Sequence, residues 1–397
     1  MTGVLERRLD ELYAIGALPE GGVFRPLYGD AWAAAGERVE HWMKQAGLKT
    51  RHDAVGNIWG RADGRGGEQS KSVVTGSHID TVRHGGRLDG ALGIVAGITA
   101  VESLLKTKGR PRQPLEVVAI CEEEGSRFAT SFWGSRAIVG DIETADDDIG
   151  QAMRERGFDP RRIATAARTD IDTFVELHIE QGAVLETSGM PVAIVSAIVG
   201  TAHLEVVVTG RPDHAGTTPM ELRRDALAAS AAMIHAIESL ARSLGRPAVA
   251  TVGRLRVEPD QINVVPGRAV FTVDLRHSNL SAREAIEARI RSLCSTIASE
   301  RSLGVDIRIL QQRSPVPMNR EVRAVLAQAA KDCGVEAPEM DSGAGHDAQI
   351  LAARCKVGML FVPSIGGRSH CPEEATSPRH LELGTRVLAR ALELLAY

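Results

Sequence analysis

The sequence places a histidine and two aspartates around a glycine-rich turn that could hold a metal ion. His78 closely follows the apolar run Val73–Gly76, so it lies at the carboxyl end of an expected strand, where α/β proteins bind their ligands. Asp80 can accept a hydrogen bond from the imidazole and fix the tautomer that binds a cation. Asp89 precedes an expected helix, and its carboxylate could bridge two cations. Taken alone, His78 and Asp80 are more simply interpreted as part of a polar loop, and Asp89 as a helix cap.

Three consecutive glutamates, Glu122–Glu124, directly follow the apolar run Leu115–Ile120. Carboxylates this close repel one another unless cations or hydrogen-bond donors offset their charge. Metal-dependent hydrolysis uses such a cluster well, because one glutamate can bind the ion while its neighbour takes a proton from the attacking water. For this segment by itself, an exposed acidic turn is the simpler interpretation.

Two further histidines occupy equivalent places. His178 ends the alternating run Phe174–His178, and His370 lies on a glycine-rich loop after the run Val357–Val362. A lone histidine is more often structural than a ligand, but here three histidines and two acidic clusters all fall at the ends of expected strands. This mixed nitrogen and oxygen set suits zinc, manganese or cobalt. Cysteine is absent from the set, which favours a catalytic ion over a structural one.

The elements that must position these residues alternate between strands and helices, which predicts an α/β protein. Helical spacing of apolar residues predicts helices over Asp30–Ala46 (with Asp30 as cap), Leu92–Lys106, Asp225–Leu244, Ala282–Glu300, Arg320–Lys331 and His380–Ala396. β-branched or alternating runs predict strands over Val73–Gly76, Leu115–Ile120, Phe174–His178, Leu204–Thr209, Val270–Leu275 and Val357–Val362.

The segment 201–314 has a rhythm of its own, namely strand, helix, strand, strand, helix, strand. This order suits a small two-layer domain with helices on one face of a sheet. We therefore expect one larger α/β domain from residues 1–200 and 315–397, with residues 201–314 inserted as a smaller domain. The chain has 397 residues, which is enough for two domains.

Composition excludes several classes of protein. Hydrophobic residues make up 43% and charged residues 25%, with a formal net charge of −4, which gives no reason to expect nucleic acid or a membrane as partner. The charged residues 1–12 do not resemble a signal peptide, and no run approaches the ~20 apolar residues of a membrane span. The 5 cysteines are scattered and form neither a disulfide framework nor a zinc-ribbon pattern. A cytoplasmic protein is the expectation.

Taken in order, these residues resemble the M20-type metallopeptidase and amidohydrolase superfamily, and within it the carbamoyl-amidohydrolase branch. The motifs that carry the branch resemblance are Gly76–Asp80, Glu123–Gly125, His178–Gly182, His214–Met220, Asn263–Gly267, Asp274–His277 and Ser342–Asp347. Four stretches are similar to the allantoate-hydrolysing members in particular: Glu123–Phe128, Phe132–Ser135, Pro315–Asn319 and His346–Ile350. Together these motifs span nearly the whole chain.

The resemblance implies a metal centre and a fold. One divalent cation would be held by His78, Asp89 and His178, and a second by Asp89, Glu124 and His370. Glu123 would be the catalytic base, and Asp80 would support the site from behind the ligands. The larger domain would be of the di-metal aminopeptidase type. The inserted domain would be α+β and ferredoxin-like, and would serve dimerisation or act as a lid.

The resemblance also implies how the substrate is held. His214 would stabilise the oxyanion, Arg276 and Asn263 would bind a carboxylate, and Gln181 and His346 would orient the ureido end. His214, Asn263 and Arg276 would come from the partner subunit of a homodimer. From the residues alone, Arg276 could equally form a surface ion pair and Asn263 a turn.

The expected function is hydrolysis of the terminal carbamoyl group of allantoate to ureidoglycine, ammonia and carbon dioxide, within purine (ureide) breakdown. The cofactors would be two divalent ions, manganese or zinc, with cobalt also possible. The segment Gly366–Arg368 varies among the branches of the superfamily, so it does not identify the substrate side chain that the pocket accepts. Hydrolysis of an N-carbamoyl-L-amino acid or of ureidoglycolate therefore stays the alternative. A dipeptidase fits the His214 motif less well. A non-catalytic, ligand-binding homologue would be expected to lack the base or a ligand, and every one of those positions is filled.

Overall fold

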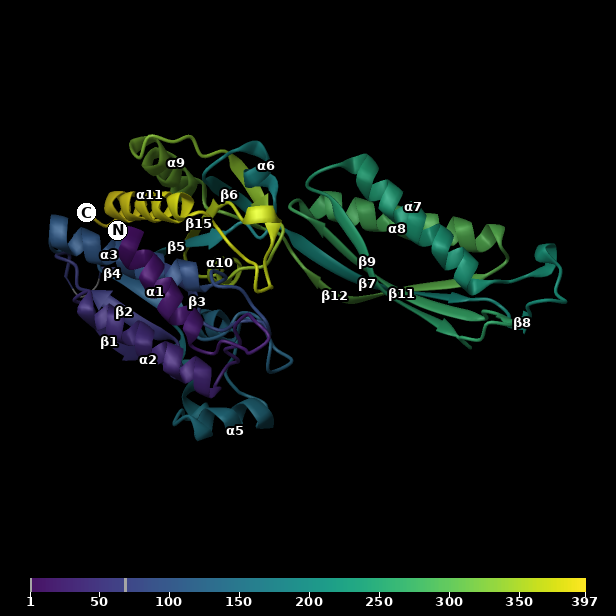
Figure 1. The fold of residues 1–397 in the computed structure, drawn as a ribbon, viewed down its shortest axis with the longest axis horizontal. Helices are drawn as coiled ribbons and strands as arrows, with labels where there is room; N and C mark the ends of the chain where they lie inside the picture. The colour runs from purple at the N-terminus through teal and green to yellow at the C-terminus, as the bar shows by residue number, and fades with distance from the viewer. Residues whose placement is uncertain (1, 68–69) are drawn as a thin grey trace. The chain divides into compact units, whose positions relative to one another are not determined.

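The computed structural model describes residues 2–67 and 70–397 of the chain. They form two compact units, which are Met1–Ser196 with Met318–Tyr397, and Ala197–Pro317 (Figure 1). The chain passes between the units a few residues from the boundaries predicted at 200/201 and 314/315. The larger unit contains the expected metal ligands, and the smaller unit contains His214, Asn263 and Arg276.

The larger unit is built on a mixed sheet with the order β1-β2-β4-β3-β5-β15-β6, in which β14 also pairs with β6. The short strand β13, which pairs with the end of β6, lies within residues 197–317. Its four central strands run parallel: β4 (Leu115–Ile120), β3 (Ser72–His78), β5 (Ile171–Ile179) and β15 (Lys356–Val362). Their residues are almost all buried, as expected for parallel strands covered on both faces. Because the four strands are parallel, their carboxyl ends meet at one edge of the sheet.

The outer strands of this sheet run against its centre. β2 pairs antiparallel with β4, and β6 pairs antiparallel with β15. The bounds of the outer strands are β1 Lys49–His52, β2 Ile58–Ala62, β6 Ala193–Ile198, β13 Val316–Pro317 and β14 Glu339–Ser342. Pairing on both sides therefore keeps the four parallel strands in the middle of the sheet, where burial excludes water.

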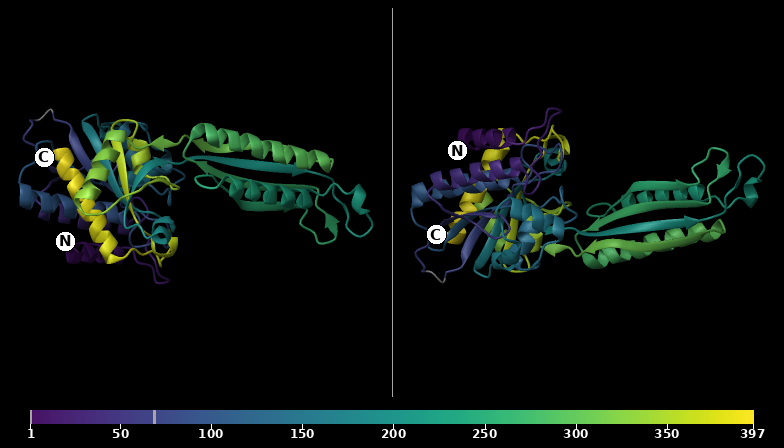
Figure 2. Two further views of the ribbon diagram at one scale, coloured as in Figure 1. Left: turned by 90° about the horizontal axis from the view of Figure 1, so that it is seen from above. Right: turned by 90° about the horizontal axis from the view of Figure 1, so that it is seen from below.

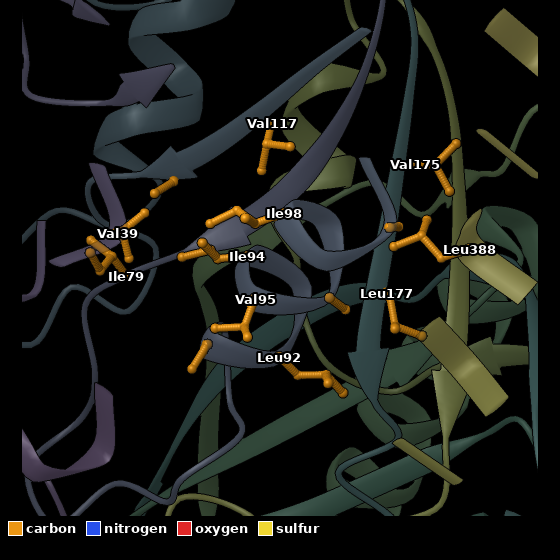
Figure 3. Close-up of a cluster of buried hydrophobic side chains, with 14 of the residues drawn as sticks. Val39, Ile79, Leu92, Ile94, Val95, Ile98, Val117, Val175, Leu177 and Leu388 are labelled. Carbon is orange, nitrogen blue, oxygen red and sulfur yellow. The ribbon is translucent and has the colours of Figure 1, made fainter. Parts of the chain in front are cut away.

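Helix α3 (Ala91–Lys108) forms the centre of the core. It begins after Gly90 and ends at Gly109, and twelve of its residues are buried. Apolar side chains of α3 pack with others from β4, β5 and α11 (Pro378–Ala396), as Figure 3 shows for Ile94, Ile98, Val117, Val175, Leu177 and Leu388. Each fully buried side chain of this size stabilises the fold by about 1.5–3 kcal/mol relative to an exposed one. The core thus fixes the amino-terminal end of α3 against the carboxyl ends of the strands.

The remaining helices of the larger unit pack around this centre. They are α1 Thr2–Ala14, α2 Asp30–Gln45, α4 Trp133–Val139, α5 Asp147–Glu155, η1 Pro160–Ala166, α6 Val184–Ser188, α9 Arg320–Asp332, α10 Asp347–Leu351 and η3 Ile365–Gly367. None of the helices in the described part of the chain is long and apolar enough to cross a membrane.

The smaller unit is built on a four-stranded antiparallel sheet with the helices α7 and α8, as Figure 2 shows. Its elements, in chain order, are β7 Gly200–Thr209, β8 Asp213–His214, η2 Met220–Leu222, α7 Ala226–Leu244, β9 Val249–Glu258, β10 Val264–Val265, β11 Arg268–His277, α8 Leu280–Glu300 and β12 Gly304–Arg313. The strand order β12-β7-β11-β9 with all neighbours antiparallel is the ferredoxin-like arrangement predicted for this segment. Apolar residues on one face of the sheet pack against α7 and α8 around Phe271.

One expectation about the helices was wrong, and one long helix was not predicted. Asp30 does not cap α2, because it is the first residue of the helix and Gly29 takes the cap position without a side-chain hydrogen bond. Helix α1 was not predicted. Its Leu5, Leu9 and Leu12 recur at helical spacing and are fully buried, but the charged residues between them obscure the pattern. The other predicted helices and strands are present, with ends that differ by a few residues.

Candidate metal centre

The carboxyl edge of the parallel strands gathers the residues predicted as ligands. β3 ends at His78, β4 leads into Glu122–Glu124, and β5 carries His178 one residue before its end. His370 lies on the loop that follows β15 and η3. Asp89 is delivered from the side by the turn before α3. It is not the helix cap, because Gly90 holds that position and no side-chain cap bond is made.

Asp89 faces a different set of ligands with each carboxylate oxygen. Oδ1 lies 3.4 Å from Nε2 of His78 and 3.1 Å from Nε2 of His178. Oδ2 lies 3.0 Å from Nε2 of His370, and that nitrogen is 3.4 Å from Oε1 of Glu124. One carboxylate is thus shared between two ligand groups, as the sequence predicted for a centre that holds two cations.

The two buried histidines present the same ring nitrogen to this space. Nδ1 of His178 donates to the carbonyl oxygen of Ile179 at 2.9 Å, and Nδ1 of His78 lies 3.2 Å from the carbonyl oxygen of Asp80 and 3.3 Å from its Oδ1. With the proton on Nδ1, each Nε2 keeps a lone pair that can bind a cation. Asp80 therefore lies where it can support His78.

Asp80 also holds the glutamate segment. Its carboxylate accepts the backbone N–H groups of Glu123 at 3.0 Å and Glu124 at 3.2 Å. Burial raises the pKa of Glu123 well above its usual range, an effect that the charge of His78 opposes and the charge of Glu124 reinforces. Burial raises the pKa of Glu124 to about 7, and the nearby charge of Asp89 adds to the rise. A cation would reverse such shifts, because it favours the ionised carboxylates.

The donor set fits a pair of divalent cations. The atoms of His78, Asp89 and His178 lie within 4.8 Å of one another, and so do those of Asp89, Glu124 and His370. Among the described residues, Nε2 of His178 is buried and lacks a hydrogen-bond partner, although Asp89 is nearby. A buried ring nitrogen in this state is what a metal ligand presents. Imidazole and carboxylate together suit zinc, manganese or cobalt.

The remaining site residues of the larger unit differ in their surroundings. Nε2 of Gln181 donates to Oδ2 of Asp89 at 3.0 Å, and its Oε1 is buried without a partner among the described residues. His346 is 2% exposed and packs edge-on against His178, with ring centroids 4.5 Å apart. Burial lowers the pKa of His346 well below its usual value, so the ring is neutral. Gln181 therefore faces the ligands directly, whereas His346 lies behind His178.

The structure does not gather His214, Asn263 and Arg276 in one place within the smaller unit. β8, which ends at His214, pairs with β10 directly after Asn263, and the Asn263 carbonyl accepts the N–H of the residue after His214. This hairpin adjoins the Arg268 end of β11, whereas Arg276 lies at the other end and pairs with Asp274. The eight residue-to-residue steps from Arg268 to Arg276 span roughly 26 Å at ~3.3 Å each.

Sequence reasoning missed Glu374 and Ser369, which lie against the ligand Asp89. It also left Glu176 without a role, although this buried carboxylate accepts the hydroxyl of Ser77 and the N–H of Ala348. The pair Glu373-Glu374 so close to His370 was the available signal, because acidic pairs had already marked the ligands elsewhere in the chain.

A model of peptidase family M20/M25/M40 matches residues 74–394. The chain belongs to this family. The predicted resemblance and the expectation of a hydrolase are thereby confirmed. Two relatives are similar over almost their full lengths. An allantoate amidohydrolase of Bacillus subtilis is 42% identical over 98% of this chain and 96% of its own. An N-carbamoyl-L-amino acid amidohydrolase of Geobacillus stearothermophilus is 39% identical over 99% and 98%.

A solved structure matches the fold of this M20 chain. An amidase of the hydantoinase/carbamoylase family from Burkholderia multivorans aligns with a TM-score of 0.94 and 33% identity, over 100% of this chain and 98% of that one. The predicted α/β class is confirmed. The identities of 42% and 39% are too close to separate an allantoate enzyme from a carbamoyl amino acid enzyme.

Proposed function

We propose that this protein is an allantoate amidohydrolase that removes the terminal carbamoyl group as ammonia and carbon dioxide and leaves ureidoglycine. Two divalent cations, manganese or zinc with cobalt possible, would be its cofactors, and cytoplasmic purine breakdown its setting. The observation that carries the proposal is that the carboxylate of Asp89 belongs to two ligand groups, which lie beside Glu123. The similarity to an allantoate amidohydrolase along 98% of the chain supports allantoate as the substrate.

The chain's own residues supply the acid–base chemistry. When bound, the cations would polarise the ureido carbonyl and acidify the attacking water. Glu123 takes the proton from that water and passes it to the leaving nitrogen. Without cations the surroundings of Glu123 raise its pKa, and bound cations would shift it back towards the ionised form that can accept the proton. Gln181, whose amide oxygen is free to accept, would receive an N–H group of the ureido end.

His214 is prepared to donate to the oxyanion. Its Nδ1 accepts the backbone N–H groups of Gly216 at 3.0 Å and Thr217 at 3.2 Å. With Nδ1 as acceptor, the proton of a neutral ring is on Nε2, which can stabilise the negative charge that develops on the carbonyl oxygen. We assign the substrate carboxylate to Arg276 and Asn263, because a guanidinium is the natural bidentate partner of that group. His346 orients the ureido end through His178.

The placement of these residues supports a homodimer. Since His214 and Arg276 lie near opposite ends of β11, a small ureido acid cannot touch both in one copy of the smaller unit. A site that uses both must take them from two copies. This refines the prediction that one partner subunit supplies His214, Asn263 and Arg276 together. We propose that His214 and Asn263 come from one subunit and Arg276 from the other, with the smaller unit forming the dimer contact.

The test is ammonia release by purified, manganese-loaded protein. Allantoate is compared with ureidoglycolate, several N-carbamoyl-L-amino acids and a dipeptide, and the Glu123→Gln variant is the control for contaminating activity. Turnover of allantoate above all others supports the proposal. Preference for a carbamoyl amino acid or for ureidoglycolate would move the assignment to that sister activity. Metal binding without turnover of any substrate would indicate a ligand-binding homologue, and full activity of Glu123→Gln would exclude the proposed chemistry.

A further inference from the structure

The buried carboxylate of Glu374 joins the two loops that carry Asp89 and His370. Oε1 of Glu374 accepts the backbone N–H groups of Leu88 at 2.8 Å and Asp89 at 3.0 Å. Oε2 accepts the hydroxyl of Ser369 at 2.7 Å. The glutamate is only 5% exposed, so three charge-assisted hydrogen bonds stabilise its charge away from water.

The packing around this carboxylate is close. A Cβ atom at Gly86 would lie 2.2 Å from Oε1 of Glu374, so the turn can approach only because residue 86 is glycine. The hydroxyl of Ser369 lies 3.4 Å from Oδ2 of Asp89 as well as contacting Glu374. Glu374 therefore holds the backbone of Asp89 directly. It also holds Ser369, whose hydroxyl lies beside Oδ2 of Asp89. That is the oxygen that faces His370.

The two ligand groups differ in how firmly the fold holds them. His78 and His178 lie on buried strands and use Nδ1 for contacts with backbone carbonyls. His370 lies on a loop, its side chain is 49% exposed, and its backbone has a left-handed φ of 57°. A ligand on such a loop needs a tether to keep its distance from Asp89 constant.

We propose that Glu374 is a positioning residue that sets the spacing of Asp89 and His370, and so the affinity for the cation held by Asp89, Glu124 and His370. The inference rests on the proposed function, because it assumes that this ligand group holds a cation. It assigns Glu374 no contact with the substrate. Its loss weakens one cation site while the group of His78, Asp89 and His178 keeps its own cation.

The experiment measures Mn²⁺ binding to the metal-free full chain, with free Mn²⁺ followed by electron paramagnetic resonance. The variants are Glu374→Ala, Glu374→Gln and, as matched control, Glu373→Gln, whose carboxylate is 60% exposed and pairs with Arg368. We expect two ions in the wild type and in the control. Glu374→Ala should keep one ion and bind the other about 10–100-fold more weakly. Glu374→Gln should lie between, because its amide oxygen still accepts the N–H groups of Leu88 and Asp89.

The outcomes separate the two proposals. Two ions bound to Glu374→Ala with wild-type affinity, or equal weakening of both ions, would overturn the role of Glu374 and leave the proposed function standing. A wild type that binds none of Mn²⁺, Zn²⁺ and Co²⁺ would overturn both. If Glu374→Ala does not fold, as judged by tryptophan fluorescence, Ser369→Ala replaces it. Removal of that hydroxyl deletes one of the three hydrogen bonds to Glu374 and should lower the affinity for the same ion. An unchanged affinity in Ser369→Ala would also overturn the inference.

Discussion

The carboxylate of Asp80 accepts the backbone N–H group of Glu123 at 3.0 Å, so the residue that supports His78 also positions the proposed base. One buried side chain therefore couples a metal ligand to the group that moves the proton. Removal of such a supporting residue lowers metal affinity or activity by about 10–100-fold.

Replacement of Asp80 by asparagine should lower kcat for allantoate by about 10–100-fold with little change in KM. The amide keeps the size of the side chain, but only its oxygen can accept a hydrogen bond. Asparagine therefore cannot accept the N–H groups of both Glu123 and Glu124 with separate atoms as it also faces the imidazole of His78. Steady-state kinetics and metal content would be measured together. Asp63→Asn is the control, since that carboxylate is 39% exposed and pairs with Lys49. An Asp80→Asn enzyme with wild-type kcat would contradict the coupling.

Mixing two inactive variants should restore activity if His214 and Arg276 of different subunits share one site. In a heterodimer of His214→Ala and Arg276→Ala, one site carries both substitutions and the other carries neither. Random re-association of equal amounts should therefore give roughly a quarter of the wild-type activity. Each variant alone and a mixture kept from exchanging subunits are the controls. If activity stays absent after exchange is verified by mass spectrometry, both residues act from the same copy or the chain does not form this dimer.

The parts of the site that could be predicted are those that follow a strand. Apolar runs mark β3, β4 and β5, and parallel strands bring their carboxyl ends together, so His78 and His178 were expected to meet. Glu374 could not be found in this way. It lies 286 residues from Leu88 in the sequence, and no periodic pattern connects the two loops.

The placement of the site residues along the strands of the smaller unit could not be predicted from the sequence either. The spacing of His214 and Arg276 along the chain does not reveal that β11 separates them, because their positions depend on how β10 leads into that strand. Helix α1 was missed for a different reason. A short, highly charged segment has weak helix signals of its own and is stabilised here by burial of its leucines, which only the tertiary structure provides.

The larger unit should lose stability in acid through the buried pair of Glu116 and Arg168. Burial alone would raise the pKa of Glu116, but hydrogen bonds from Arg168 and Ser72 and the charge of Arg61 outweigh it and lower the pKa. A carboxylate with a lowered folded-state pKa contributes stability that is fully present above its unfolded pKa of ~4.3 and is lost as pH falls through the folded value.

Glu116→Gln should therefore destabilise the protein by about 1–3 kcal/mol at pH 7, because it removes the buried carboxylate that pairs with Arg168 and leaves the more exposed Asp170 as the remaining partner. The difference from the wild type should shrink below pH 4. Urea unfolding at pH 7 and pH 3.5 would be followed by tryptophan fluorescence, which reports on the larger unit since all 4 tryptophans lie there. A difference that does not change with pH would show that Glu116 contributes by packing alone.

The two glycines at the ends of α3 both have a positive φ but different surroundings. Gly90 has φ 66° and Gly109 has φ 72°, so alanine is strained at either position. Their surroundings differ. A Cβ atom at residue 90 would lie 2.3 Å from the carbonyl oxygen of His78 and 2.6 Å from its ring, whereas a Cβ atom at residue 109 would meet nothing within 4 Å.

Both substitutions should therefore lower the free energy of unfolding by about 1–2 kcal/mol through backbone strain. Only Gly90→Ala should also displace the ring of His78 and reduce the affinity for Mn²⁺, with a matching loss of activity. Metal titration and urea unfolding of both variants separate the effects. Equal metal affinities for the two variants would mean that the close approach of residue 90 does not set the position of His78. A selective loss in Gly90→Ala would identify glycine there as a requirement of the metal centre rather than of the helix.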